Sequence, residues 1–371
     1  MIGFYNDSAS HGCIMYYMFT YPIVSKIKHV ISHIWGGTKI ALDLGTSNTR
    51  IGIHEKGVVI REPTYIALNT KNSEYLFFGI EAKEMYGKAP HFIHIIKPMR
   101  DGVVSDFDAE VALMRHFFQK AVYPFFSGRN IVKSKLIGYT VVPTSSTEVE
   151  QKAIQEALIK AGLHEVHLIE KPIACALGAH LPIFSNTPYF VIDLGGGLVE
   201  MVVITMGGIV AQKIFKNAGE HMDKLIHNYI HLKYGLLIGE ATAEFLKTTL
   251  LRLDNQEKVE TVRGKSLENG LPKSIRVKSG DIKEALVSHF NHIINMAKEL
   301  IETVPPEIID GIMKNGIVLT GQLAHVPGIE SFIETDLKVP VKIAPSPQDA
   351  TINGILLSLS DKKNLSRLLL G

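Results

Sequence analysis

Two short turns rich in aspartate and glycine carry the groups best suited to chemistry. The first reads Asp-Leu-Gly-Thr-Ser-Asn over residues 43–48, and the second reads Asp-Leu-Gly-Gly-Gly over residues 193–197. Glycine lets a phosphate approach the exposed backbone N–H groups of such a turn. A carboxylate repels phosphate, so we expect each aspartate to hold a Mg²⁺ ion through water. The predicted phosphate-binding residues are Asp43, Gly45, Thr46, Ser47, Asn48, Asp193, Gly195, Gly196 and Gly197, and the predicted metal-binding residues are Asp43 and Asp193.

The elements that must position these turns occur twice along the chain. Each turn lies between two apolar stretches, as the turn of a β-hairpin does, and the two aspartates are 150 residues apart. The same offset relates residues 57–60 to residues 207–210, where each hairpin turns into a third strand. Two hairpins in one register predict a duplicated α/β domain. Strands and helices alternate elsewhere, which predicts a mostly parallel sheet in each half.

Composition limits the class of protein. The chain has 371 residues, of which 46% are hydrophobic and 20% charged, so a large core is expected and general disorder is not. The net charge of +2 argues against a nucleic-acid partner. Cys13 and Cys175 are too few for a disulfide framework or a four-cysteine zinc site and fit a reducing compartment. No run reaches the ~18 apolar residues of a membrane span. We therefore expect a multi-domain cytoplasmic α/β protein.

Several further stretches carry a resemblance to a known family. They are residues 43–49, 58–63, 98–103, 147–154, 234–240, 270–273, 305–307 and 316–321. The chain resembles the superfamily of actin, sugar kinases and DnaK-type ATPases, and within it the MreB/Mbl family of bacterial actin homologues. This resemblance implies an actin-like fold, with duplicated ribonuclease-H-like α/β domains around a nucleotide cleft. It also implies ATP and Mg²⁺ as cofactors, self-association into filaments, and cell-wall elongation proteins as partners at the inner face of the cell membrane.

The resemblance implies further site residues. In this family one helix and one loop contact the adenosine side of the nucleotide. The matching residues here are Glu240, Ala243, Glu244 and Lys247 on the helix, and Gly321, Gln322, Leu323 and Ala324 in the loop. Glu150 matches the family's water-activating glutamate and is the predicted catalytic residue. Thr147 and Glu150 also have the spacing of a helix capping box, and both roles are compatible.

Two departures from the family pattern bear on activity. The family has two threonines after the second glycine turn, one of which positions the attacking water, whereas this chain has Leu198 and Val199. The adenosine loop of the family has three consecutive glycines, and here Gln322 and Leu323 replace two of them. Because leucine and valine cannot hydrogen-bond to water, we expect ATP to be bound and hydrolysed slowly or not at all.

The duplication and the resemblance together predict the domain boundaries. Residues 1–37 form an N-terminal extension, and residues 38–180 form domain I with a small insertion at about 64–105. Residues 181–350 form domain II with an insertion at about 217–280, and residues 351–371 form a C-terminal helix that returns to domain I.

Two segments are predicted to contact a membrane, which gives a cytoplasmic, membrane-associated localisation. Ile27, Ile31 and Ile34 lie at helical spacing opposite basic residues, with Trp35 at the end, as in a helix lying in a bilayer interface. Phe125 and Phe126 lie in a loop predicted over residues 123–128 with basic neighbours, where the family inserts an apolar loop into membrane. Alternatively, the N-terminal helix packs on its own domain, and Phe125 and Phe126 close the core of theirs.

Two other functions compete with a dynamic ATP-binding filament. A small-molecule kinase of the same superfamily requires a second substrate pocket with a general base, and the sequence identifies none. A nucleotide-locked scaffold that does not hydrolyse ATP is favoured by Leu198, Val199 and Gln322.

Overall fold

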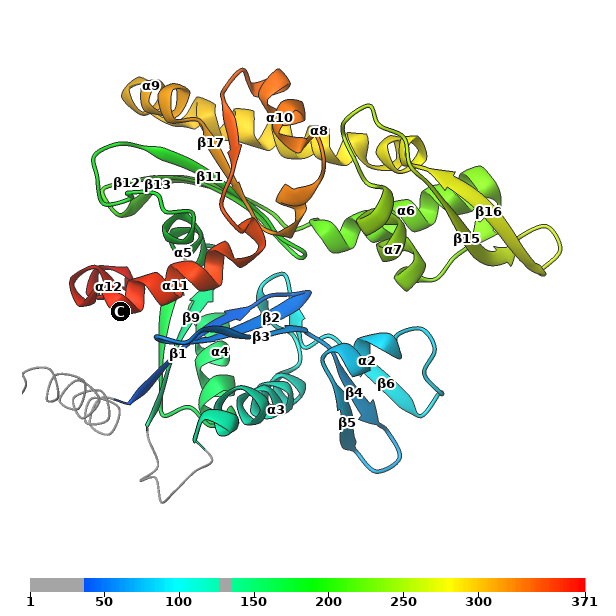
Figure 1. The fold of residues 1–371 in the computed structure, drawn as a ribbon, viewed down its shortest axis with the longest axis horizontal. Coiled ribbons are helices and arrows are strands. Elements are labelled where there is room, and N and C mark those ends of the chain that lie inside the picture. Colours follow the sequence, from blue (N-terminus) through cyan, green and yellow to red (C-terminus); the bar gives the residue numbers. More distant parts are fainter. Residues whose placement is uncertain (1–36, 127–134, 371) are drawn as a thin grey trace, which may run out of the picture.

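The computed structural model describes residues 37–126 and 135–370 (Figure 1). The predicted membrane residues Ile27, Ile31, Ile34 and Trp35 lie outside these two ranges. Within the ranges, no helix is both long and apolar enough to cross a membrane.

The first main sheet contains six strands. They are β1 (Thr38–Leu44), β2 (Asn48–Ile53), β3 (Gly57–Pro63), β9 (Leu136–Val142), β10 (Glu165–Glu170) and β19 (Leu369–Leu370). Their order is β19-β10-β9-β1-β2-β3. The β1-β2-β3 meander is antiparallel, and β1, β9 and β10 run parallel.

The second main sheet repeats this arrangement with five strands. They are β11 (Tyr189–Leu194), β12 (Val199–Thr205), β13 (Gly208–Phe215), β17 (Ile317–Thr320) and β18 (Val341–Ile343), in the order β13-β12-β11-β17-β18. Again an antiparallel meander joins a parallel part. Asp43 pairs with Arg50 in the first sheet, and Asp193 pairs with Glu200 in the second. Both pairs obey the offset of 150 residues, so the predicted duplication is confirmed.

Side-chain alternation along the strands divides each sheet into two apolar faces. Ile40 and Leu42 of β1 pack against α3 (Phe107–Phe126) and α4 (Glu148–Ala161). Ala41 belongs to a different cluster, which contains residues of α5 (Lys171–Gly178), α11 (Ala350–Ser360) and the facing side of the second sheet. Helices α5 and α11 therefore lie between the two sheets (Figure 1).

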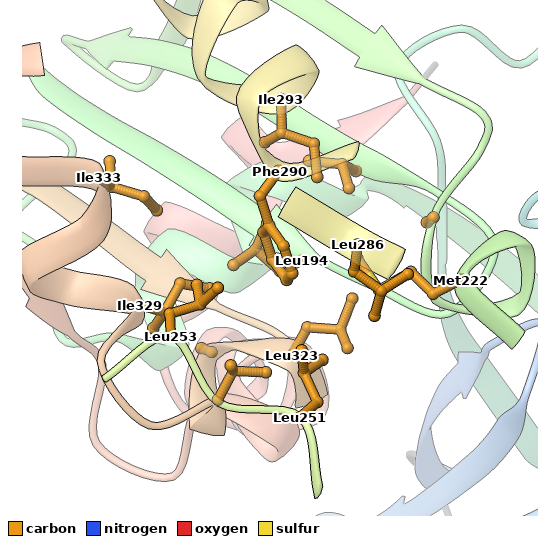
Figure 2. Packing of buried hydrophobic residues seen from close by; sticks show 14 of the residues in the cluster. Leu194, Met222, Leu251, Leu253, Leu286, Phe290, Ile293, Leu323, Ile329 and Ile333 are labelled. Carbon is orange, nitrogen blue, oxygen red and sulfur yellow. The ribbon is translucent and has the colours of Figure 1, made fainter. Parts of the chain in front are cut away.

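The outer face of the second sheet carries the largest core. It packs against the helices α6 (Gly219–Tyr234), α7 (Glu240–Leu250), α8 (Ser279–Thr303), α9 (Pro306–Asn315) and α10 (Ile329–Leu337). Figure 2 shows Leu194 of β11 and Phe290 of α8 in this cluster together with Leu251 and Leu323. The last two residues also line the cleft described below, so the core supports the wall of that cleft directly.

Two smaller sheets project from the main ones (Figure 1). The first contains β4 (Ile66–Asn69), β5 (Glu74–Phe78) and β6 (Ile93–Ile96). It is followed by the short strands β7 (Met99–Arg100) and β8 (Val103–Val104), which pair with each other. The second small sheet contains β14 (Leu236–Leu237), β15 (Val259–Ser266) and β16 (Pro272–Lys278). Helix α2 (Ile80–Glu84) accompanies the first small sheet. After α11, the short α12 (Lys362–Leu368) leads to β19, which pairs with β10 at the edge of the first main sheet.

Helices α5 and α11 cross at two glycines. A Cβ atom added to Gly178 would lie 1.8 Å from the carbonyl oxygen of Ala350, and one added to Gly354 would lie 1.8 Å from that of Ala174. The two backbones are thus in direct contact, which only glycine permits at both positions. Helix α5 connects β10 of the first sheet to β11 of the second, and α11 follows β18 on the way back to β19. Both connections between the halves therefore meet at this crossing.

The prediction that residues 123–128 form a loop is wrong for its first four residues. Helix α3 continues to Phe126, so Phe125 and Phe126 lie in its last turn. Ala121 and Val122 are buried and extend the apolar face of α3 in this direction, which favours continuation of the helix. The side chains of Phe125 and Phe126 lie outside the described part of the structure.

Candidate nucleotide cleft

The two predicted turns have matching geometry. A Cβ atom on Gly45 would lie 2.5 Å from the carbonyl oxygen of Asn48, and one on Gly195 would lie 2.7 Å from that of Leu198. Each hairpin therefore requires glycine at this position to close its turn. The N–H of Gly195 also donates to the carbonyl of Leu198 over 2.9 Å.

The two turns are in contact across the interface between the halves. A Cβ atom on Gly196 would lie 2.3 Å from Ser47 Oγ, and one on Gly197 would lie 2.3 Å from Thr46 Oγ1. A cavity of about 270 Å³ lies at this junction. The predicted residues that line it are Asp43, Gly45, Thr46, Ser47, Asn48, Asp193, Gly195, Gly196, Gly197, Glu244, Lys247, Gly321, Gln322 and Leu323.

Three of the predicted nucleotide-binding residues do not line this cavity. Ala243 and Ala324 are completely buried in the apolar core, because they lie on the inner sides of α7 and of the short helix η1 (Gln322–His325). Glu240 lies one turn before Glu244 and lines a second cavity of about 440 Å³, between α2 on one side and α6 and α7 on the other. There Glu240 accepts a hydrogen bond of 2.6 Å from the hydroxyl of Tyr86.

Helices α6 and α7 build the wall beside the second turn. The backbone N–H of Glu220 donates to the carbonyl of Gly196 over 2.8 Å, which ties the first turn of α6 to the glycine turn. Lys247 donates to the carbonyl of Gly219 over 2.7 Å and to Asp223 over 2.8 Å. Burial raises the pKa of Asp223 to about 6, although Lys247 opposes this.

Two ion pairs beside the cleft connect the first half to helices α6 and α7. Lys83 Nζ of α2 lies 2.7 Å from Glu244 Oε1 of α7, and Lys97 Nζ lies 3.3 Å from Glu220 Oε1 of α6. The same Glu220 carboxylate accepts a hydrogen bond of 3.4 Å from Ser47 Oγ. Residues of the first half of the chain therefore contact α6 and α7, the two helices with which the second half lines the cleft.

Four charged residues at the cleft were not predicted from the sequence: Arg50 and Lys171 line it, and Asp349 and Glu200 pair with them. Arg50 Nη1 lies 3.1 Å from Asp43 Oδ2, and Arg50 Nε lies 3.1 Å from Asp349 Oδ1. Lys171 Nζ lies 2.6 Å from Asp193 Oδ2 and 3.8 Å from Glu200 Oε2. Arg50 and Glu200 obey the offset of 150 residues, a signal from which both could have been found. Lys171 and Asp349 carry no such signal.

Burial changes the acidity of these groups. Burial raises the pKa of Asp43, and the nearby charge of Arg50 opposes that change. Burial also raises the pKa of Glu200 to about 7. For Lys171 burial favours the neutral amine, but the carboxylates of Asp193 and Glu200 outweigh it and raise the pKa, so Lys171 carries its charge at neutral pH.

The predicted role of Asp43 and Asp193 in holding Mg²⁺ does not fit this arrangement. Each carboxylate is already paired with a cation of the chain, Asp43 with Arg50 and Asp193 with Lys171. Asp193 Oδ1 additionally accepts a hydrogen bond of 2.9 Å from Thr320. In residues 37–126 and 135–370, no group of three or more His, Cys, Asp or Glu side chains is placed to hold a metal ion.

Glu150 does not line either of these cavities within the described residues. Its carboxylate accepts hydrogen bonds from the backbone N–H of Thr147 over 2.7 Å and from Thr147 Oγ1 over 2.9 Å. The hydrogen bond from the Thr147 backbone lowers the pKa of Glu150. The capping box is confirmed, and the catalytic role of Glu150 stays a prediction.

The two residues that replace the family's threonines are both buried. Leu198 lines the cleft with 3% of its surface exposed. Its Cδ1 atom lies 3.2 Å from the position of a Cβ on Gly102, so the leucine fills the space beside that turn. Val199 is fully buried in the core. An apolar side chain therefore occupies the cleft where a hydroxyl group is expected.

Comparisons with known proteins agree with this architecture. Among solved structures, MreB5 of Spiroplasma citri bound to ADP superposes with a TM-score of 0.83 at 31% identity, covering 89% of this chain and 98% of that chain. The MamK double helical filament has a TM-score of 0.73 at 19% identity over 87% of this chain and 99% of that chain, which is a likeness of fold alone.

Sequence relatives and a family model extend the comparison. The cell shape-determining protein Mbl of Bacillus subtilis is 38% identical over 328 residues, or 87% of this chain and 96% of the relative. The cell shape-determining protein MreB of Escherichia coli is 34% identical over 322 residues, or 85% of this chain and 91% of the relative. The model of the MreB/Mbl protein family matches residues 37–367. With its duplicated actin-like fold, this chain belongs to the MreB/Mbl family.

Proposed function

We propose that this chain binds ATP in the cleft and polymerises into filaments that help to determine cell shape. The observation that carries the proposal is the contact between the two glycine turns, Gly196 on Ser47 and Gly197 on Thr46, at the cavity between the halves. Successive backbone N–H groups from both turns suit the phosphates of a nucleotide. Glu244, Lys247 and Gln322 line the remaining wall and suit the adenosine side.

The relatives support both parts of this proposal. MreB5 of Spiroplasma citri, at 31 and 32% identity, is bound to ADP in one structure and to AMPPNP in another. Mbl and MreB are cell shape-determining proteins. By analogy, we propose that the filament consists of copies of this chain and organises cell-wall synthesis together with cell-wall elongation proteins.

Slow hydrolysis is part of the proposal, and the buried Leu198 favours a scaffold that holds its nucleotide. We expect the protein to sediment as polymer with ATP or AMPPNP while releasing phosphate very slowly. Restoring a hydroxyl group with Leu198→Thr is expected to raise phosphate release by about 100-fold, the scale on which one positioned hydrogen-bond donor acts. Sedimentation and a phosphate-release assay measure the two quantities.

The control for this experiment is Leu237→Thr. Leu237 lies on β14 with 42% of its surface exposed, and it does not line the cleft. The same substitution there is expected to leave phosphate release unchanged. Wild-type turnover as fast as that of Leu198→Thr would contradict the scaffold, and absence of nucleotide-dependent polymer would contradict the filament.

We also propose that the filament lies on the inner face of the cell membrane. Ile27, Ile31, Ile34 and Trp35 form the predicted interfacial helix, and basic residues on its other side suit anionic lipid. In the full chain, Ile31→Glu is expected to reduce co-pelleting with anionic vesicles several-fold. The control Val149→Glu replaces an apolar side chain of α4 that is 78% exposed. Equal pelleting of Ile31→Glu and wild type would contradict this helix as an anchor.

A further inference from the structure

Lys171 brings a positive charge to the centre of the cleft. It is the first residue of α5, directly after β10, and its side chain is 19% exposed on the cavity side. Its ammonium group lies 2.6 Å from Asp193 Oδ2 and 3.8 Å from Glu200 Oε2. The Asp193 side chain is 4% exposed and that of Glu200 is completely buried. The ammonium therefore compensates two buried carboxylates and still reaches the cavity.

The same ammonium lies beside the second glycine turn. A Cβ atom on Gly195 would be 3.7 Å from Lys171 Nζ. Any phosphate held by the backbone N–H groups of this turn would thus lie next to a fixed positive charge. Lysine is a compact point charge with three donors, which suits phosphate oxygens.

The other predicted metal-binding carboxylate is also neutralised by the chain. Asp43 is paired with Arg50, whose guanidinium lies between Asp43 and Asp349 with 13% of its side chain exposed. A divalent cation between Asp43 and Asp193 would therefore meet two resident cations that already compensate those carboxylates. At distances of about 4 Å, such like charges repel strongly in a partly buried site.

We propose that Lys171 supplies the positive charge that a divalent cation would otherwise bring to the nucleotide phosphates, so that this chain binds ATP without a divalent metal. This inference rests on the proposed function, since it assumes that ATP occupies the cleft. The group recognised is the metal-free polyphosphate of a nucleoside triphosphate. Lys171 would then be the residue that makes ATP binding independent of a divalent metal.

The first measurement requires no variant. The dissociation constant for ATP is determined by titration calorimetry on the full chain, once with excess EDTA and once with excess Mg²⁺. We expect the two values to agree within about threefold. Binding that requires Mg²⁺ would overturn the inference and leave the proposed function intact, whereas no binding in either buffer would overturn the proposed function itself.

The second measurement uses Lys171→Gln. Without the ammonium, ATP affinity in EDTA is expected to fall at least 10-fold. Mg²⁺ is expected to restore much of that loss, because Asp193 and Glu200 then lack their cation and can take up a divalent one. The variant thus converts a metal-independent site into a metal-dependent one. Equal affinity of Lys171→Gln and wild type in EDTA would overturn the inference.

Two further variants separate this effect from loss of folding. Lys171→Arg keeps the charge and is expected to bind ATP in EDTA more tightly than Lys171→Gln. Lys213 lies on the outer strand β13 and pairs with Glu299 of α8. The variant Lys213→Gln is expected to bind ATP as wild type does in both buffers. Melting curves of all proteins with Mg²⁺ but no nucleotide provide an independent readout. Only Lys171→Gln is expected to be stabilised by Mg²⁺, and stabilisation of wild type by Mg²⁺ alone would count against the inference.

Discussion

Gly354→Ala is expected to lower the melting temperature by about 5 to 10 °C. The added Cβ would lie 1.8 Å from the carbonyl oxygen of Ala174 and 2.9 Å from the backbone nitrogen of Gly178. Both atoms belong to the backbone of α5 and cannot rotate away, so the two helices must separate. Overpacking of a core costs about 1 to 3 kcal/mol, and a collision between backbones belongs at the upper end. A loss of this size shifts the melting temperature of a large domain by several degrees.

Gly280→Ala is the matched control, because it is the same substitution at another helical glycine. Gly280 lies in the first turn of α8 and has no atom within 4 Å of the position of the added Cβ. Alanine is the better helix former, so this variant is expected to melt at or slightly above the wild-type temperature. If Gly354→Ala melts within 1 °C of wild type, the close crossing of α5 and α11 is absent from the folded protein.

Gly197→Ala is expected to weaken ATP binding by about 10- to 100-fold while the protein remains folded. The added methyl group would lie 2.3 Å from Thr46 Oγ1 and 2.9 Å from Thr46 Cβ. Thr46 is buried and accepts a hydrogen bond of 3.1 Å from the N–H of Gly102, so it has little freedom to move. The two turns would be forced apart, and a cost of about 1 to 3 kcal/mol corresponds to this loss of affinity. Titration calorimetry with ATP measures it.

The control for this variant is Gly208→Ala, at the start of β13. The nearest atom to the added Cβ is the carbonyl oxygen of Thr205 at 4.0 Å, and Gly208 does not line the cleft. Affinity for ATP and the melting temperature are both expected to stay at wild-type values. Unchanged affinity in Gly197→Ala, with a normal melting curve, would show that the contact between the turns plays no part in nucleotide binding.

Local patterns predicted the parts of the structure that depend on neighbours in the chain. The hairpins at Asp43 and Asp193 could be recognised because strand, turn and strand are consecutive. The capping box of Thr147 and Glu150 spans three residues, and the structure contains it. The predicted loop at Phe125 and Phe126 is wrong because these residues resemble an exposed aromatic loop when the helix before them is not considered.

Contacts between segments that lie far apart in the chain could not be predicted from the sequence. Lys171 and Asp193 are close only because β10, α5 and β11 fold around one another. Asp349 meets Arg50 only because η2 (Pro347–Asp349) returns to the first hairpin. The burial of Ala243 depends on which side of α7 faces the core, and that is decided by the packing of α6, α7 and α8 rather than by the residues of α7 alone.

The glycine crossing of α5 and α11 also has a mechanical consequence. Two backbones in contact cannot slide past each other, and both connections between the halves pass through this point. The relative movement that remains is a rotation of the two halves about the crossing. A small change in the spacing between the two glycine turns therefore produces a larger displacement at the small sheets, which lie farther from the crossing.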